Sequence, residues 1–220
     1  VVAGVLSRLA RLAEAAAVLV LRLFECRYEL GSLDDQSFLE ALELLESYLF
    51  RRAVCGLQTR AYWARFSAIA YRVGDSESLR RLKVELARQP TAYRFPDDAE
   101  FKAELTTRPI YGMRGCHYLL DRLENAGSKE PIDTSGYTIE HILPQNPVVP
   151  TAWREMLGED WEEVHPLWVH RLGNLTLTGY NSTYQDRPFE DKKTIPGGFS
   201  ESSVRLNRYV REQPTWGVAE

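Results

Sequence analysis

The stretch TIEHILPQN, residues 138–146, places a histidine between a glutamate and a run of apolar residues. Ile139 and Ile142 are β-branched, a side-chain type that favours strands. Pro144 cannot continue a strand ladder, because its nitrogen carries no hydrogen to donate. The sequence therefore predicts that His141 lies near the end of a short strand.

A second strand is predicted downstream, within HRLGNLTLTGYNSTYQDRPFEDKK, residues 170–193. Residues 175–178 alternate apolar and polar side chains, and the Gly-Tyr-Asn of residues 179–181 turns the chain. Pro188 suits the first turn of a helix. Short helices are expected between the strands, at about residues 150–170. The predicted order is strand, helical insertion, strand and helix.

The first part of the chain has a helical pattern instead. Apolar residues recur at spacings of three and four over residues 6–23 and 38–49, as in helices with one buried face. Further helices fit residues 61–72, 77–88, 98–105 and 109–126. We therefore expect a helical bundle over residues 1–126, a polar linker over 127–136, and a second domain over 137–220 that contains the helical insertion.

The charge balance excludes attraction to polyanions through net charge. Lys and Arg total 27 against 31 Asp and Glu, so the net charge is −4 at pH 7. Such a chain attracts neither nucleic acid nor an anionic membrane as a whole. Any bound DNA must therefore contact a local basic patch.

No membrane segment or secretion signal is expected. Arg8, Arg11, Glu14 and Arg22 interrupt the apolar start of the chain, whereas a spanning helix needs about 20 apolar residues. The three cysteines are far apart and form no zinc-binding pair. We therefore expect free thiols in a cytoplasmic protein. Because the apolar helical pattern is already under way at Val1, we also expect the chain to be part of a longer protein.

Four motifs carry a resemblance to a known family. The order Glu140-His141, Asn174 before a leucine, and Asn181 resembles the signature of HNH, or His-Me finger, nucleases. HRLGNLTLTGYN, RPFEDKK and SVRLNRYVREQPTW are similar to the C-terminal nuclease domain of GmrSD-type, modification-dependent (type IV) restriction endonucleases. The segment ELGSLDDQSFLEALELLESYLFRRAVCGL resembles the helical region ahead of that domain. The resemblance implies a mainly α fold with a small ββα element: a helical bundle followed by a His-Me finger core.

The resemblance also implies roles for these residues in phosphodiester hydrolysis. His141 is expected to be the general base, because an imidazole takes up a proton near neutral pH. Asn174 is expected to brace the loop around it through backbone hydrogen bonds. Asn181 and Glu140 are the expected oxygen ligands of one Mg²⁺ or Mn²⁺. An alternating strand points Glu140 away from the face that His141 uses, so this pairing calls for a bulge or a strand end. The alternative is that His141 is a buried structural histidine.

Five basic residues are candidates for contacts with DNA phosphates. They are Lys192, Lys193, Arg187, Arg51 and Arg52. The alternative for Arg51, Arg52, Lys192 and Lys193 is a solvated residue that complements a helix dipole. His165 and His170 bracket Trp168, and a structural role is favoured for both over a second metal site.

Three functional classes follow. The first is a metal-dependent DNA endonuclease or nickase, the cleavage part of an anti-phage restriction system acting on double-stranded phage or modified DNA. The second is a catalytically silent relative that binds DNA or a partner. The third is a coupling module that links the nuclease to an N-terminal sensor domain of the same longer chain. In the resembling family that sensor hydrolyses nucleotides, but no phosphate-binding loop occurs here. We therefore expect this chain itself to bind no nucleotide.

Overall fold

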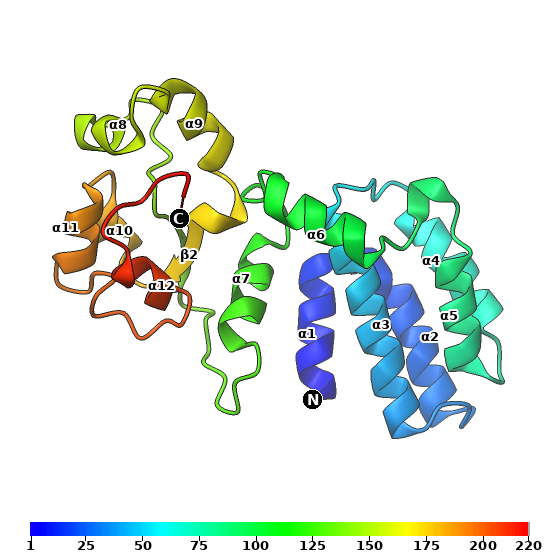
Figure 1. Ribbon diagram of the computed structural model, residues 1–220. Helices are drawn as coiled ribbons and strands as arrows, with labels where there is room; N and C mark the ends of the chain where they lie inside the picture. Colours follow the sequence, from blue (N-terminus) through cyan, green and yellow to red (C-terminus); the bar gives the residue numbers. More distant parts are fainter. Residues whose placement is uncertain (220) are drawn as a thin grey trace. The chain divides into compact units, whose positions relative to one another are not determined.

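The computed structural model describes residues 1–219 and divides into two compact units, Val1–Glu104 and Leu105 onward. It is mainly helical with one two-stranded antiparallel sheet, as the sequence predicts (Figure 1). No helix in residues 1–219 is both long enough and apolar enough to cross a bilayer.

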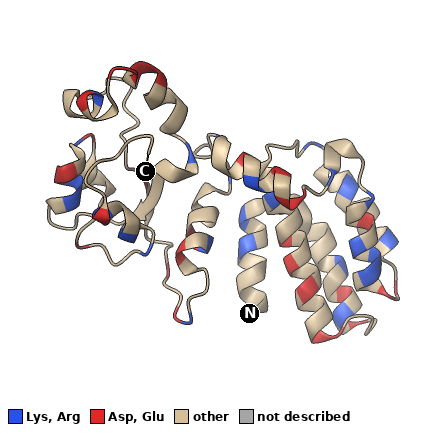
Figure 2. Cartoon of the chain, in the orientation of Figure 1, with Lys and Arg blue, Asp and Glu red and all other residues tan. Residues whose placement is uncertain are grey.

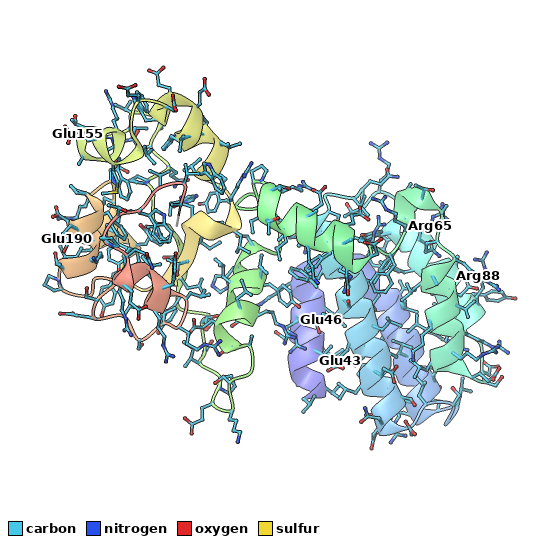
Figure 3. The ribbon with its side chains drawn as sticks, viewed as in Figure 1. Glu43, Glu46, Arg65, Arg88, Glu155 and Glu190 are labelled. Atoms are coloured by element: carbon cyan, nitrogen blue, oxygen red, sulfur yellow. The ribbon has the colours of Figure 1, made fainter. Side chains whose placement is uncertain are left out.

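The first unit is a bundle of amphipathic helices. Its main helices are α1 (Val2–Leu12), α2 (Ala17–Tyr28), α3 (Asp35–Val54), α4 (Tyr62–Val73) and α5 (Ser78–Ala87). Asp34 caps α3 by accepting a hydrogen bond from the backbone N–H of Ser37 at 2.7 Å. Arg8 of α1 donates two hydrogen bonds to Glu46 of α3, which is labelled in Figure 3. Leu19, Leu23 and Leu42 are fully buried between these helices.

Arg52 belongs to the interior of this unit. Its guanidinium donates to the carbonyl oxygens of Gln58, Ala92 and Arg94 and to the hydroxyl of Tyr62, at 2.7–3.1 Å. The side chain has no exposed surface. The predicted phosphate contact by Arg52 is therefore wrong, because its buried guanidinium already donates four hydrogen bonds within this unit.

The second unit contains the sheet and the helices that precede, separate and follow its two strands in the sequence. After α6 (Asp98–Thr107), which runs across the boundary between the units, they are α7 (Cys116–Asn125), α8 (Thr151–Leu157), α9 (Trp161–Trp168), α10 (Asn181–Tyr184), α11 (Phe189–Thr194) and α12 (Asn207–Glu212). Trp153, Phe189 and Trp216 lie in one hydrophobic cluster with Ile142 and Leu143. Ile142 and Leu143 directly follow the first strand, so this cluster includes the chain segment at the end of that strand.

The sheet pairs β1 (Thr138–His141) with β2 (Leu175–Thr178) in a regular antiparallel register. The chain order is strand, helical insertion, strand and helix, as predicted. His141 is the last residue of β1 and lies opposite Leu175.

The boundary between the units differs from the one predicted at residue 126. Helix α7 contacts β2 and belongs to the second unit. Its Glu124 carboxylate accepts hydrogen bonds from the backbone N–H groups of Arg205 and Leu206, at 2.8 and 3.0 Å. The helical periodicity of α7 is the same in either unit, so only these long-range contacts assign it.

Candidate active site

His141 is anchored through one of its two ring nitrogens. Its Nε2 lies 3.1 Å from Nδ1 of His170, and the ring of Tyr111 meets the His141 ring edge-on with centroids 4.3 Å apart. His141 is only 5% exposed. Burial, together with nearby His170 and Lys192, lowers the pKa of His141 to about 4. The imidazole is therefore neutral at pH 7.

The other ring nitrogen of His141 is open. Among residues 1–219, no group forms a hydrogen bond with Nδ1, and this atom is not fully enclosed. A neutral imidazole with a proton on Nε2 carries its lone pair on Nδ1. In that tautomer, His141 can accept a proton from a water molecule at this position.

Asn174 holds the chain segment that follows His141. Its Oδ1 accepts from the backbone N–H of Leu143 at 2.7 Å and from the indole N–H of Trp216 at 3.1 Å. Its Nδ2 donates to the carbonyl oxygens of Leu143 and Val169, each at 2.9 Å. These four bonds use the full hydrogen-bonding capacity of the amide. Asn174 is thus a geometric brace with no atom left for a metal.

Lys192 of α11 is buried beneath the end of β1. Its ammonium donates to Glu140 Oε1 at 2.6 Å and to the carbonyl oxygens of His141 and Ile142 at 2.8 and 3.1 Å. These three acceptors match the three hydrogens of a charged lysine amine. The side chain has no exposed surface. The predicted phosphate contact by Lys192 is therefore wrong, because this amine supports the strand from inside.

The environment of Glu140 opposes its ionisation. Burial raises the pKa of the carboxyl to about 7 and outweighs the attraction of Lys192. Burial also lowers the pKa of Lys192, against the attraction of Glu140. The regular register of β1 gives no bulge, so Glu140 contacts α11 while His141 contacts His170. The two neighbours point to opposite faces of the strand, as the alternation predicts.

Two oxygens near this strand remain available for a metal ion. Asn181, the first residue of α10, donates from Nδ2 to the carbonyl of Ile139 at 2.7 Å, which leaves its Oδ1 without a hydrogen bond among the described residues. Glu140 Oε2 also receives no hydrogen bond there and is not fully enclosed. Hard oxygens of this kind suit Mg²⁺ or Mn²⁺. No group of three or more His, Cys, Asp or Glu in residues 1–219 could hold a metal ion.

Residues 95–220 match the model of the C-terminal domain of GmrSD restriction endonucleases. The chain belongs to the GmrSD restriction endonuclease family. This confirms the predicted resemblance. No curated protein and no solved structure matches the chain.

The remaining candidate phosphate contacts of this GmrSD chain differ in their availability. Lys193 donates to the carbonyl of Gln213 at 2.9 Å and pairs with Glu190, which is labelled in Figure 3. In the first unit, Arg51 pairs with Asp98 at 2.5 Å. Arg187 is exposed, and within residues 1–219 only the Nε of its guanidinium forms a hydrogen bond, to the carbonyl of Thr183 at 3.0 Å. Arg187 is therefore the most available of the five.

The sequence indicates neither of two residues that contact His141 in the GmrSD site. It favours a structural role for His170 and places Tyr111 in a helix. The structure brings both against His141, and Tyr111 also stacks on His170 with centroids 5.4 Å apart and planes 11° apart. No local signal in the sequence links residues so distant along the chain. His165 does have a structural contact, since its Nε2 lies 2.8 Å from the carbonyl of Pro144.

Proposed function

We propose that the second unit is a metal-dependent nuclease of the HNH, or His-Me finger, type that hydrolyses phosphodiester bonds in double-stranded phage or modified DNA. One observation carries the proposal: in a restriction-endonuclease domain, a neutral histidine at a strand end is anchored at Nε2 and open at Nδ1. The strand, the insertion, the second strand and helix α10 follow in the order that this class of nuclease requires.

In this mechanism, His141 prepares the attacking water. Hydrolysis forms a bond between a water oxygen and phosphorus while the opposite phosphorus–oxygen bond breaks, and the water must lose a proton. Nδ1 of His141 takes that proton. Its pKa of about 4 keeps Nδ1 unprotonated at neutral pH, although it makes the imidazole a weaker base than one with a pKa near 7.

Other residues of the chain hold this geometry. Asn174 fixes the backbone of Leu143, two residues beyond His141. Lys192 holds the carbonyl of His141 itself. Asn181 Oδ1 would be a ligand of the divalent cation, which would supply positive charge to the phosphate and the departing oxygen. Glu140 points to the opposite face of β1 from His141 and pairs with Lys192, so its carboxylate does not fit the second ligand position that the sequence predicts.

The charged side chains on the surface of the second unit make some of its edges more favourable for DNA binding than others. Figure 2 shows acidic residues along the start of α9, where Glu159, Asp160, Glu162 and Glu163 are all exposed. This edge repels phosphates, whereas Arg187 offers an open guanidinium. We therefore propose weak, sequence-independent DNA binding that falls steeply with salt. Recognition of the modification would belong to a nucleotide-hydrolysing sensor domain outside these residues.

A catalytically silent domain is the competing proposal. It is favoured by the Lys192–Glu140 pair, because an ammonium occupies one oxygen of the carboxylate that the sequence predicts as a metal ligand. Such a domain would bind DNA or couple the sensor to a partner without cutting.

Cleavage of supercoiled plasmid DNA distinguishes the nuclease from the catalytically silent domain. The chain is incubated with Mg²⁺ or Mn²⁺, and nicked and linear products are separated on a gel. We expect cleavage that EDTA abolishes and that falls by about 10² to 10⁴-fold in His141→Ala. His117→Ala is the matched control, since His117 is a half-buried histidine of α7 that contacts the carbonyl of Tyr137. Plasmid that is bound in a gel shift but never cut would support the silent domain instead.

A further inference from the structure

The contact between His141 and His170 has two possible proton arrangements. In the first, Nε2–H of His141 donates to Nδ1 of His170, and the lone pair of His141 lies on its open Nδ1. In the second, Nδ1–H of His170 donates to His141, whose own proton then occupies Nδ1. Only the first arrangement leaves His141 able to accept a proton from water, because the hydrogen bond of one ring nitrogen fixes the state of the other.

The first arrangement is chemically favoured. It places the protons of both rings on Nε2, the tautomer that free histidine prefers, whereas the second requires the less stable Nδ1–H form in both rings. It also remains intact when His141 gains a proton, because an imidazolium Nε2–H donates a stronger, charge-assisted hydrogen bond. The pair is thus suited to both the resting and the protonated states of His141.

His170 is itself held firmly in place. Its carbonyl oxygen accepts from the backbone N–H groups of Ile110 and Tyr111, at 2.9 and 3.2 Å. An isolated β-bridge joins Pro109 to Arg171, the next residue. The ring of Tyr111 stacks on His170 and meets His141 edge-on, so one side chain restricts both imidazoles.

From these contacts we propose that His170 is a positioning residue for His141. Its Nδ1 lone pair holds the proton of His141 on Nε2 and so keeps Nδ1 open to water, while Tyr111 fixes the two rings. This inference rests on the proposed nuclease function. It assigns His170 no contact with DNA or metal.

Two substitutions at His170 separate hydrogen bonding from packing. His170→Phe keeps a planar ring against Tyr111 but removes the acceptor. His170→Asn restores an acceptor, because the amide Oδ1 occupies nearly the position of Nδ1. We expect kcat for plasmid nicking to fall on the order of 10 to 100-fold in the Phe variant, with KM unchanged. The Asn variant should stay within a few-fold of the parent.

Nitrogen NMR of the histidine rings tests the proposal without cleavage. In the parent we expect a protonated Nε2 and an unprotonated Nδ1 for His141, with its signals assigned through His141→Gln. In His170→Phe, the Nδ1–H form should appear as well. The control His117→Phe should change neither these signals nor kcat.

The outcomes separate this inference from the proposed function. A parent protein that cuts DNA but carries the His141 proton on Nδ1 would overturn the role of His170 alone. The same holds if the Phe and Asn variants lose kcat equally, since packing would then explain the loss. A parent with the expected tautomer that cuts no DNA would refute the nuclease function, while the hydrogen bond from His141 to His170 would stand. If His170→Phe does not fold, two measurements still test the role of His170. The parent must carry the His141 proton on Nε2, and the kcat of His170→Asn must stay within a few-fold of the parent value.

Discussion

Trp216 donates its indole N–H to Oδ1 of Asn174 at 3.1 Å, inside the hydrophobic cluster of the second unit. The C-terminal segment is thereby tied to the residue that braces the end of β1. Leu143 and Val169 share the same amide, so one side chain joins segments from three parts of the chain.

The indole bond should be measurable by substitution. Trp216→Phe keeps most of the apolar contact but removes the donor, so we expect a loss of about 1 to 2 kcal/mol in the free energy of unfolding. Nicking should fall as well, because Asn174 loses one of its restraints. Urea titration measures the change in the free energy of unfolding. Trp63→Phe, at a tryptophan that is 55% exposed in the first unit, should leave both unchanged; equal effects in the two variants would contradict this role.

Adjacent lysines of α11 offer a matched pair. Lys192→Met leaves the Glu140 carboxylate buried without its partner, and we expect a cost of about 3 to 5 kcal/mol. Lys193→Met removes a partly exposed pair with Glu190, for which we expect about 1 kcal/mol or less. Thermal and urea unfolding give both values. The double variant Lys192→Met with Glu140→Gln should recover part of the loss. Equal losses of unfolding free energy in Lys192→Met and Lys193→Met would contradict the larger contribution expected from the buried Lys192–Glu140 pair.

The lowered pKa of His141 predicts a pH dependence of stability. In the folded protein, His141 takes up a proton only near pH 4, whereas in the unfolded chain it does so near 6.5. Its contribution is thus fully present above about pH 6.5 and is lost as the pH falls towards 4. Relative to His141→Gln, the parent should lose up to about 3 kcal/mol between pH 7 and 4. The comparison cancels the opposite effect of Glu140, whose pKa is raised.

Tryptophan fluorescence in urea at several pH values tests this. Four of the five tryptophans lie in the second unit, namely Trp153, Trp161, Trp168 and Trp216. A difference between parent and variant that is constant from pH 7 to 4 would contradict the lowered pKa.

Metal affinity should depend on Asn181. Asn181→Ala removes the open Oδ1, so we expect a higher Mg²⁺ concentration for half-maximal nicking, by roughly 10-fold, with little change in the rate at saturating metal. Ser182→Ala, at an exposed neighbour in α10, is the control. An unchanged Mg²⁺ requirement in Asn181→Ala would remove this residue as a ligand.

The strands were predictable because their signals are local. The β-branched residues and Pro144 predict β1 and its end, and alternation predicts β2. The opposite orientations of Glu140 and His141 follow from the same alternation. These features depend on neighbours within a few residues, which the sequence displays directly.

The interior charges were not predictable in the same way. Two consecutive lysines follow Phe189 and two consecutive arginines precede Ala53, and the sequence does not tell which of each pair turns inward. Lys192 and Arg52 are buried where backbone carbonyls of residues distant in the sequence accept hydrogen bonds from their side chains. The contact between His141 and His170 likewise depends on tertiary packing.

The pairing of β1 with β2 has a consequence for the order of folding. Leu143 and Asn174 meet although 31 residues separate them, and closing so long a loop costs entropy before any contact repays it. Helices α8 and α9 lie inside this loop, and their backbone hydrogen bonds join residues only three or four positions apart. We infer that they form first and shorten the loop. In pulse-labelling hydrogen exchange, the amide of Val164 should then gain protection before that of Ile142; the reverse order would refute this. His141 would therefore reach His170 and Tyr111 only late in folding, so a nascent or partly folded chain would lack the assembled site on which the proposed nuclease activity depends.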